Sequence, residues 1–296
     1  MIEAAIVTAI RRRLTSALAP PRELLRPLRI EGHAVGWLDG RRAVRLRAFA
    51  DVFDVRDEEI AVAPQLADVA MRTVAFDRVA RILAAEGALT AWRDELYAVA
   101  PRFGAPPWFL LERAAARYFG IHTYAAHVNG IVENSSVRTW LARRSPTKAI
   151  DPGMLDNLVG GGIAAGQSVA DAVVKEALEE AGIDASLAGC ARPAGTVDIC
   201  RAQPDGLQRE TIFVHDLSLP AEFMPACVDG EAVEHRLVGL PDAARIIANA
   251  EGPDVATADS SVVILDYLLR QGAIPRDAPE CAALDALRHP SCGPLV

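Results

Sequence analysis

Hydrophobic residues recur at helical spacing along the first 120 residues of the chain. Apolar side chains three and four positions apart, such as Leu66, Val69 and Ala70, lie on one face of a helix. This spacing predicts an amphipathic helix at the N-terminus and helices at 65–86 and 107–118, with short strands at 34–38 and 43–49. We therefore expect a small α+β domain of unassigned role over residues 1–120.

From residue 121 the pattern changes to short apolar and β-branched runs. Gly, Pro, Asn and Asp bound these runs, as is typical of strands. They predict strands at 125–132, 139–142, 195–200 and 211–216, with helices at 168–181 and 259–270. Strands around isolated helices indicate an α+β sandwich. We expect it over residues 121–275, followed by a C-terminal tail at 276–296.

The predicted helix at 168–181 has clear signals at both ends. Ser168 is a suitable N-cap, and Asp171 three residues later completes a short capping box. Gly182 suits the left-handed position that often follows a helix. At about 100° per residue, the face that we expect to pack carries Val174, Leu178 and Ala181.

The opposite face of this helix carries three carboxylates, Glu176, Glu179 and Glu180. Their Cβ atoms would be about 5–6 Å apart, and each pair would repel by about 1 kcal/mol even in water. A divalent cation reverses that cost, and oxygen ligands are those that Mg²⁺ prefers. We therefore predict that the three glutamates bind Mg²⁺ or Mn²⁺. An acidic solvated face is the alternative that the helix alone leaves open.

A glycine-rich segment directly before the helix extends this motif. Residues 161–183 read GGIAAGQSVADAVVKEALEEAGI, which resembles the Nudix box G-x5-E-x7-R-E-U-x-E-E-x-G-U, where U is aliphatic. The positions that match in register are Gly161, Glu176, Glu179, Glu180, Gly182 and Ile183. Gln167 replaces the first Glu of the pattern and Lys175 replaces its Arg, so we expect a hydrogen bond between them instead of an ion pair.

The resemblance implies a Nudix α/β/α sandwich that hydrolyses a diphosphate with the help of a metal ion. It assigns Glu176, Glu179 and Glu180 as metal ligands and catalytic carboxylates, with Lys175 beside them in the catalytic group. Further segments resemble the Nudix branch that some eukaryotes carry fused to thiamin pyrophosphokinase: 111–115, 119–121, 127–130, 140–145, 152–157, 214–217 and 229–231. That branch implies hydrolysis of thiamin diphosphate, preferably with an oxidised or deaminated ring, to the monophosphate and phosphate.

Polar residues in these branch-like segments are candidates for substrate binding. With the loop glycines, the candidate set is Gly161, Gly162, Asn129, Asp156, Asn157 and Glu231, and His127 is a further polar candidate. Either Glu231 or Glu234 could supply a fourth carboxylate, because this chain departs from the branch at that point. We prefer Glu231.

The composition of the chain limits the binding partners and the cellular compartment that we expect for the protein. A net charge of −8 and a pI near 5.3 argue against a nucleic-acid-binding protein, which normally has a basic face. We expect a small-molecule diphosphate as partner and no membrane, because no apolar run is long enough to span a bilayer. Five cysteines without a C-x-x-C pair favour the cytoplasm, with an arginine-rich N-terminal targeting peptide as the alternative to an amphipathic helix. Oligomeric state stays open, with a homodimer as one option.

The sequence is also compatible with two other functions. The box selects diphosphate cleavage without selecting the leaving group, so an ADP-ribose, nucleotide-sugar or dinucleotide pyrophosphatase is the main alternative. A non-catalytic ligand-binding regulator is the second, although such a protein has little need of all three helix glutamates.

Overall fold

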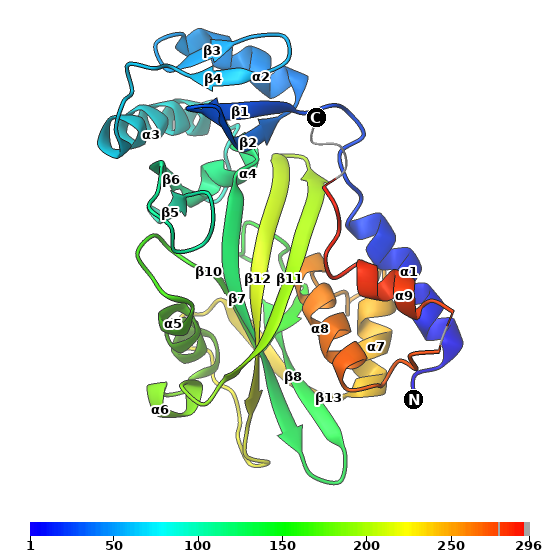
Figure 1. Ribbon diagram of the computed structural model, residues 1–296. Coiled ribbons are helices and arrows are strands. Elements are labelled where there is room, and N and C mark those ends of the chain that lie inside the picture. Colours follow the sequence, from blue (N-terminus) through cyan, green and yellow to red (C-terminus); the bar gives the residue numbers. More distant parts are fainter. Residues whose placement is uncertain (278, 293–296) are drawn as a thin grey trace.

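The first part of the chain forms a small sheet, a hairpin and the helices that cover them (Figure 1). The structure is a computed structural model that describes residues 1–277 and 279–292. The small sheet has the strand order β2-β1-β4-β3. Its strands are β1 (Arg26–Ile30), β2 (His33–Leu38), β3 (Phe53–Val55) and β4 (Ile60–Val62). The remaining elements are α2 (Gly40–Leu46), α3 (Val69–Ala85), the hairpin of β5 (Leu96–Val99) and β6 (Phe109–Glu112), and α4 (Ala116–Phe119).

Aromatic packing and one glycine fix this part of the chain. The rings of Phe76 and Phe109 stack with their centroids 4.0 Å apart, and both side chains are fully buried. Gly120 ends α4 in the left-handed conformation. A Cβ on Gly120 would lie 2.2 Å from the Trp37 carbonyl oxygen. Only glycine therefore lets the chain pass so close to β2 on its way into the second sheet.

The second sheet has seven strands in the order β11-β12-β7-β8-β13, with β10 paired to β7 and β9 paired to β8. Strands β7 and β12 are parallel, whereas the other pairs are antiparallel. The strands are β7 (His122–Glu133), β8 (Val137–Arg144), β9 (Leu155–Asn157), β10 (Val159–Gly162), β11 (Arg192–Gln203), β12 (Gly206–Ser218) and β13 (Ala232–Gly239).

Helices cover both faces of this sheet, which gives an α/β/α sandwich (Figure 1). Helices α5 (Val169–Ala181) and α6 (Ala185–Ala188) pack on one face. Helices α7 (Leu240–Ala248) and α8 (Ala258–Arg270) pack on the other. The N-terminal helix α1 (Ala4–Ala17) belongs to that second layer, because Ile10 and Leu14 are buried in the same cluster as Ile247 and Leu268.

Two of the predicted elements are wrong in type. Residues 43–49 form the end of α2 and a 3₁₀ helix (Arg47–Phe49) instead of a strand. The buried apolar residues in this segment are Ala43, Leu46 and Phe49. Their spacing of three positions is helical, but the strand was predicted from the apolar content of the segment and not from this spacing. The predicted helix at 107–118 begins as β6, whose backbone pairs with β5, and becomes helical only after Glu112.

The C-terminal segment carries a helix and a disulfide that the sequence pattern does not predict. Helix α9 (Cys281–Ala286) lies in the stretch expected to be a plain tail. A disulfide joins Cys200 on β11 to Cys292, with their Cα atoms 5.4 Å apart. Cys190, Cys227 and Cys281 are free. Within residues 1–277 and 279–292, no helix has the length and apolar character needed to cross a membrane.

Candidate active site

Helix α5 begins and ends where the capping signals predict. The Ser168 side chain accepts a hydrogen bond from the Asp171 backbone N–H, and the Asp171 side chain accepts one from the Ser168 N–H. Gly182 ends the helix in the left-handed conformation, with φ 64°. The helix is therefore fixed at both ends, which holds its side chains in register against the sheet.

The face of α5 that packs is rotated from the predicted one: Ala181 is buried and Val174 is partly buried as expected, but Leu178 is not. Leu178, expected in the core, is 51% exposed, and the buried residues are Ala172, Val173, Ala177 and Ala181. At about 100° per residue, Glu176 and Glu180 fall in the middle of this buried arc. The reason lies in the partner strand: β10 presents Gly160, Gly161 and Gly162, and small residues on both elements allow a close approach.

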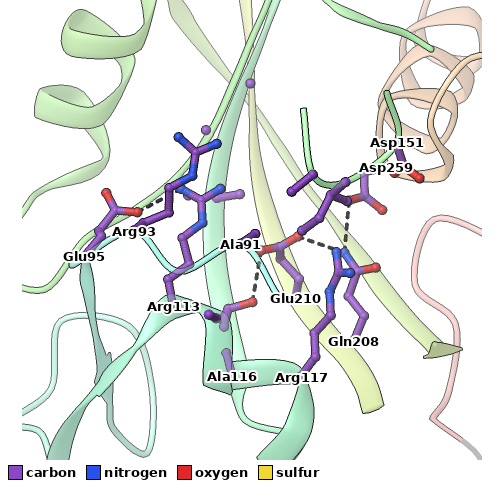
Figure 2. Close-up of a pocket in the computed structure, with 18 of the residues that line it drawn as sticks. Ala91, Arg93, Glu95, Arg113, Ala116, Arg117, Asp151, Gln208, Glu210 and Asp259 are labelled. Carbon is purple, nitrogen blue, oxygen red and sulfur yellow. Dashed lines mark hydrogen bonds and ion pairs between the residues drawn. The ribbon is translucent and has the colours of Figure 1, made fainter. Parts of the chain in front are cut away.

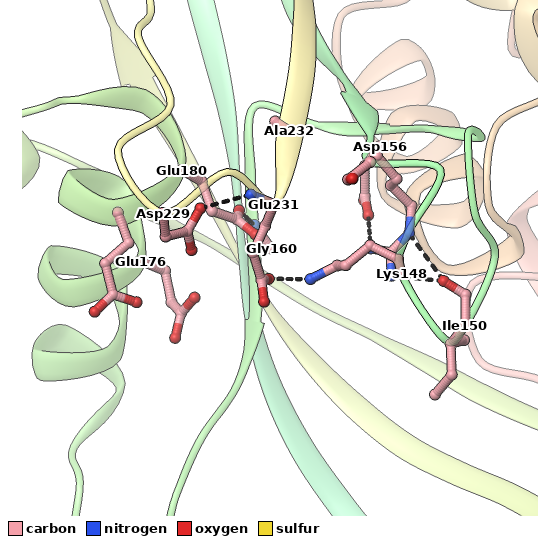
Figure 3. A network of polar contacts seen from close by, with 12 residues as sticks. Lys148, Ile150, Asp156, Gly160, Glu176, Glu180, Asp229, Glu231 and Ala232 are labelled. Carbon is pink, nitrogen blue, oxygen red and sulfur yellow. Dashed lines mark hydrogen bonds and ion pairs between the residues drawn. The ribbon is translucent and has the colours of Figure 1, made fainter. Parts of the chain in front are cut away.

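The two inward glutamates contact this glycine strand directly (Figure 3). Glu180 Oε2 accepts a hydrogen bond of 2.8 Å from the Gly160 backbone N–H. A Cβ on Gly161 would lie 2.5 Å from Glu176 Cδ. Glu179 is more exposed, and Lys175 Nζ donates to Glu176 Oε1 at 2.8 Å and to Glu179 Oε2 at 2.9 Å. All four predicted catalytic residues therefore gather at one end of α5.

The electrostatics of Glu180 suit a cation ligand. Burial raises the pKa of Glu180 well above its usual range, and the nearby charges of Asp156 and Glu176 add to that effect. A divalent cation would offset this cost, and the carboxylate donors at this end fit a hard ion of the Mg²⁺ or Mn²⁺ type. In the described part of the chain, no three acidic, histidine or cysteine side chains are already gathered closely enough to hold an ion. Ion binding would thus need small side-chain movements.

The expected bond between Gln167 and Lys175 is not present. Gln167 Oε1 accepts a hydrogen bond from the Ala164 backbone N–H, which closes the loop before α5 on itself. Lys175 instead pairs with the two glutamates on its own helix. The loop is therefore held by backbone capping, and Lys175 neutralises part of the carboxylate charge.

Each glycine of β10 leaves room for one particular side chain. A Cβ on Gly160 would lie 2.9 Å from His127 Cε1, and a Cβ on Gly162 would lie 1.9 Å from the Tyr97 hydroxyl oxygen. Glu176 lies beside Gly161 in the same way. The three glycines therefore make room for three polar side chains from different parts of the chain. The glycine run thus serves close packing of these groups as well as approach to a ligand.

A cavity of about 370 Å³ opens beside this strand and extends toward the first part of the chain. Gly160, Gly161, Gly162, Lys175, Glu176 and Glu179 line one end. Figure 2 shows residues from the N-terminal part on another wall, including Arg93, Glu95, Arg113 and Arg117. Gln208, Glu210 and Asp259, from the second sheet and α8, line the cavity beside Arg117. Apart from Arg113, which lies in the branch-like segment 111–115, no motif in the sequence marked these residues, because they meet only through the fold.

Glu231, the preferred fourth carboxylate, lines this cavity. Its Oε1 accepts from Arg93 Nη1 at 3.0 Å, and its other oxygen pairs with Lys148 (Figure 3). Burial alone would raise the pKa of Glu231, but its bonds to Lys148 and Arg93 outweigh burial and lower it. Glu234 pairs instead with Arg143 and Arg236 and does not line the cavity. The geometry therefore favours Glu231 over Glu234.

Asp156 also lines the cavity and is tied to its surroundings. Its Oδ2 accepts from Arg144 Nη1 at 2.8 Å, and its Oδ1 is bonded to the Ser260 hydroxyl. The predicted contacts at Gly161 and Gly162 lie on the same surface. Four of the six candidate substrate-binding residues are thus brought together.

Asn129 and Asn157 do not line the cavity, contrary to expectation. Each is only 2% exposed, and together they form a chain of hydrogen bonds behind the wall. Asn129 Nδ2 donates to Asp216, Asn157 Nδ2 donates to Asn129 Oδ1, and Asn157 Oδ1 lies 2.8 Å from His127 Nδ1. Because the Asp216 carboxylate can only accept hydrogen bonds, the donor and the acceptor of every bond in this series are determined. It places a proton on His127 Nδ1 and leaves Nε2 as the ring nitrogen that can accept a hydrogen bond.

Two family models match the chain. One is described as a domain of unknown function (DUF4743) and matches residues 7–123, and the other is the NUDIX domain and matches residues 123–258. The protein named Nudix hydrolase 20, chloroplastic, from Arabidopsis thaliana is 36% identical over 277 residues, which are 90% of this chain and 73% of that protein. Nudix hydrolase 24, chloroplastic, from the same plant is 37% identical over 86% of this chain and 69% of its own length.

A solved structure is also similar. The crystal structure of DR0079 from Deinococcus radiodurans superposes with a TM-score of 0.44 and 22% identity, covering 60% of this chain and 98% of that one.

Proposed function

Because the chain belongs to the Nudix hydrolases, enzymes that act on diphosphate bonds, we propose that it cleaves a small heterocyclic diphosphate with Mg²⁺ or Mn²⁺ at the glutamate end of α5. The observation that carries this proposal is the inward placement of Glu176 and Glu180 against the glycine strand, where Glu176 lines one end of a cavity. A solvated acidic face would not bury its carboxylates.

The residues at the glutamate end of α5 have different roles in the proposed reaction. Glu176 and Glu180 would hold the cation, with Glu179 as a third ligand or as the base that takes a proton from the attacking water. When bound, the cation would supply charge neutralisation of the phosphate oxygens and ionisation of that water. Lys148 and Lys175 add positive charge beside the phosphates, and the buried wall excludes other water.

We propose that the substrate is thiamin diphosphate, above all with an oxidised or deaminated ring, cleaved to the monophosphate and phosphate. The support is the set of branch-like segments that supply cavity residues, including His127, Asp156 and Glu231. A cavity of about 370 Å³ is near the small end of ligand sites. It suits one heterocycle with a diphosphate better than it suits a dinucleotide.

The test is a comparison of kcat/KM across diphosphates under one metal concentration. The panel contains thiamin, oxothiamin and oxythiamin diphosphates, ADP-ribose, a nucleotide sugar and a dinucleotide. We expect the thiamin compounds to exceed the rest by about tenfold or more. Among them, the oxidised and deaminated forms should lead by about tenfold to a hundredfold, because one buried polar group left unpaired costs about 1 to 3 kcal/mol. If ADP-ribose or the dinucleotide leads by tenfold, the thiamin assignment is wrong.

A further inference from the structure

The two ends of the cavity present different groups. At the α5 end, Lys148, Lys175 and Arg93 lie among the carboxylates, so an anionic diphosphate with its cation can bind there. At the far end stand two carboxylates from neighbouring elements, Glu210 on β12 and Asp259 on α8 (Figure 2). The Arg117 side chain lies beside these carboxylates (Figure 2), so this end offers both hydrogen-bond acceptors and a donor to the rest of the substrate.

Internal hydrogen bonds hold these two carboxylates in place. Gln208 Nε2 donates to Glu210 Oε2 at 3.3 Å and to Asp259 Oδ2 at 2.9 Å, and the Thr123 hydroxyl donates to Glu210 Oε1 at 2.9 Å. Gln208 Oε1 is occupied by Arg201 Nε at 2.8 Å. Both amide hydrogens of Gln208 are thus in use, whereas each carboxylate oxygen still has a free lone pair.

The nearby arginines do not neutralise Glu210. Arg113 pairs with Glu95 at 2.8 Å and Arg117 pairs with Asp205 at 3.5 Å. Arg201 lies 3.7 Å from Asp259. Among residues 1–277 and 279–292, no cationic nitrogen comes within 4.0 Å of the Glu210 carboxylate. Glu210 therefore keeps acceptor capacity toward the cavity.

Two further side chains on the cavity wall offer polar atoms to a ligand. His127 is 6% exposed and Tyr97 is 7% exposed. In the described residues, no hydrogen bond reaches His127 Nε2 or the Tyr97 hydroxyl, although both side chains line the cavity. On the same wall, Asp259 Oδ1 is buried and has no hydrogen-bond partner among the described residues. Buried polar groups normally have a partner, so this oxygen indicates that a ligand completes the site.

We propose that Glu210, with His127 Nε2 and the guanidinium of Arg117, forms a subsite for the nitrogen heterocycle of the substrate. Glu210 accepts a hydrogen bond from a ring N–H or amino group, and Arg117 donates to the neighbouring ring nitrogen or carbonyl oxygen. The proposal rests on the proposed function in one respect: the diphosphate must lie at Glu176 and Glu180. It also gives the N-terminal part of the chain a role, since Arg117 comes from α4.

The test compares thiamin diphosphate with methyl diphosphate, which has no ring. In Glu210→Gln, kcat/KM for thiamin diphosphate should fall at least tenfold, mainly through a higher KM, while kcat/KM for methyl diphosphate should change less than threefold. Glu210→Asp, which keeps the charge and withdraws the acceptor, should show the same pattern and guards against a folding defect in the first variant. Glu222→Gln, an exposed glutamate, is the matched control and should change neither value.

An equal loss for both substrates, or no loss for either, would overturn the subsite. The wild-type panel is measured first, so failure of the proposed function is seen separately. If ADP-ribose is the preferred substrate, the thiamin assignment fails, and the same variants compared on ADP-ribose and methyl diphosphate then test the subsite by itself.

Discussion

Replacing Glu180 or Glu176 by glutamine should lower kcat by about 100-fold or more, because each change removes an anionic ligand of the proposed cation. Stability should change little. Glutamine has the same size, and its side-chain oxygen can still accept the hydrogen bond that the Gly160 N–H gives to Glu180. The measurement is steady-state phosphate release with saturating Mg²⁺, with thermal unfolding recorded for each variant.

Glu222→Gln is again the matched control, since Glu222 is exposed and does not line the cavity. Its kcat should equal that of the unaltered chain. If both Glu176→Gln and Glu180→Gln retain near-normal kcat, the carboxylates of α5 do not bind the catalytic cation.

Replacing Gly161 by alanine should also reduce kcat strongly, on the order of tenfold to a hundredfold. The added Cβ would lie 2.5 Å from Glu176 Cδ, so either the glutamate or the strand must move. A displacement of about 1 Å in a catalytic group can cost about 100-fold. We expect a cost in stability of about 1 to 3 kcal/mol as well, typical of overpacking.

Gly40→Ala provides the control for this change. A Cβ on Gly40 meets no atom within 4 Å, so kcat and the unfolding midpoint should stay close to their original values. Activity in Gly161→Ala equal to that in Gly40→Ala would mean that the position of Glu176 does not matter for the reaction.

The sequence predicted the helix of the site well but not its orientation. Ser168 and Gly182 fixed the ends of α5 through local capping, which depends only on neighbouring residues. The buried face depends on what the helix packs against. Leu178 looked like a core residue, yet the glycines of β10 favour small side chains and place Glu180 inward. The hydrophobic periodicity of a helix reflects only the apolar residues of that helix. It gives no information about a partner strand such as β10, whose glycines have no side chains.

The far wall of the cavity could not be predicted for a different reason. Arg117, Glu210 and Asp259 lie far apart in the sequence and belong to no shared motif. They meet because β7 and β12 are parallel neighbours and α4 precedes β7 directly. Likewise, Asn129 and Asn157 resembled substrate ligands as isolated polar residues, but the fold uses them to orient His127.

The most direct test of the account is the metal dependence of phosphate release from oxythiamin diphosphate by the unaltered chain. With Mg²⁺ or Mn²⁺ present, we expect steady release of one phosphate per molecule of monophosphate formed. A chelator should reduce the rate to background, and added Mn²⁺ should restore it. An unchanged rate in chelator, or no phosphate release with either metal, would contradict the assignment of this cavity as a metal-dependent diphosphate hydrolase.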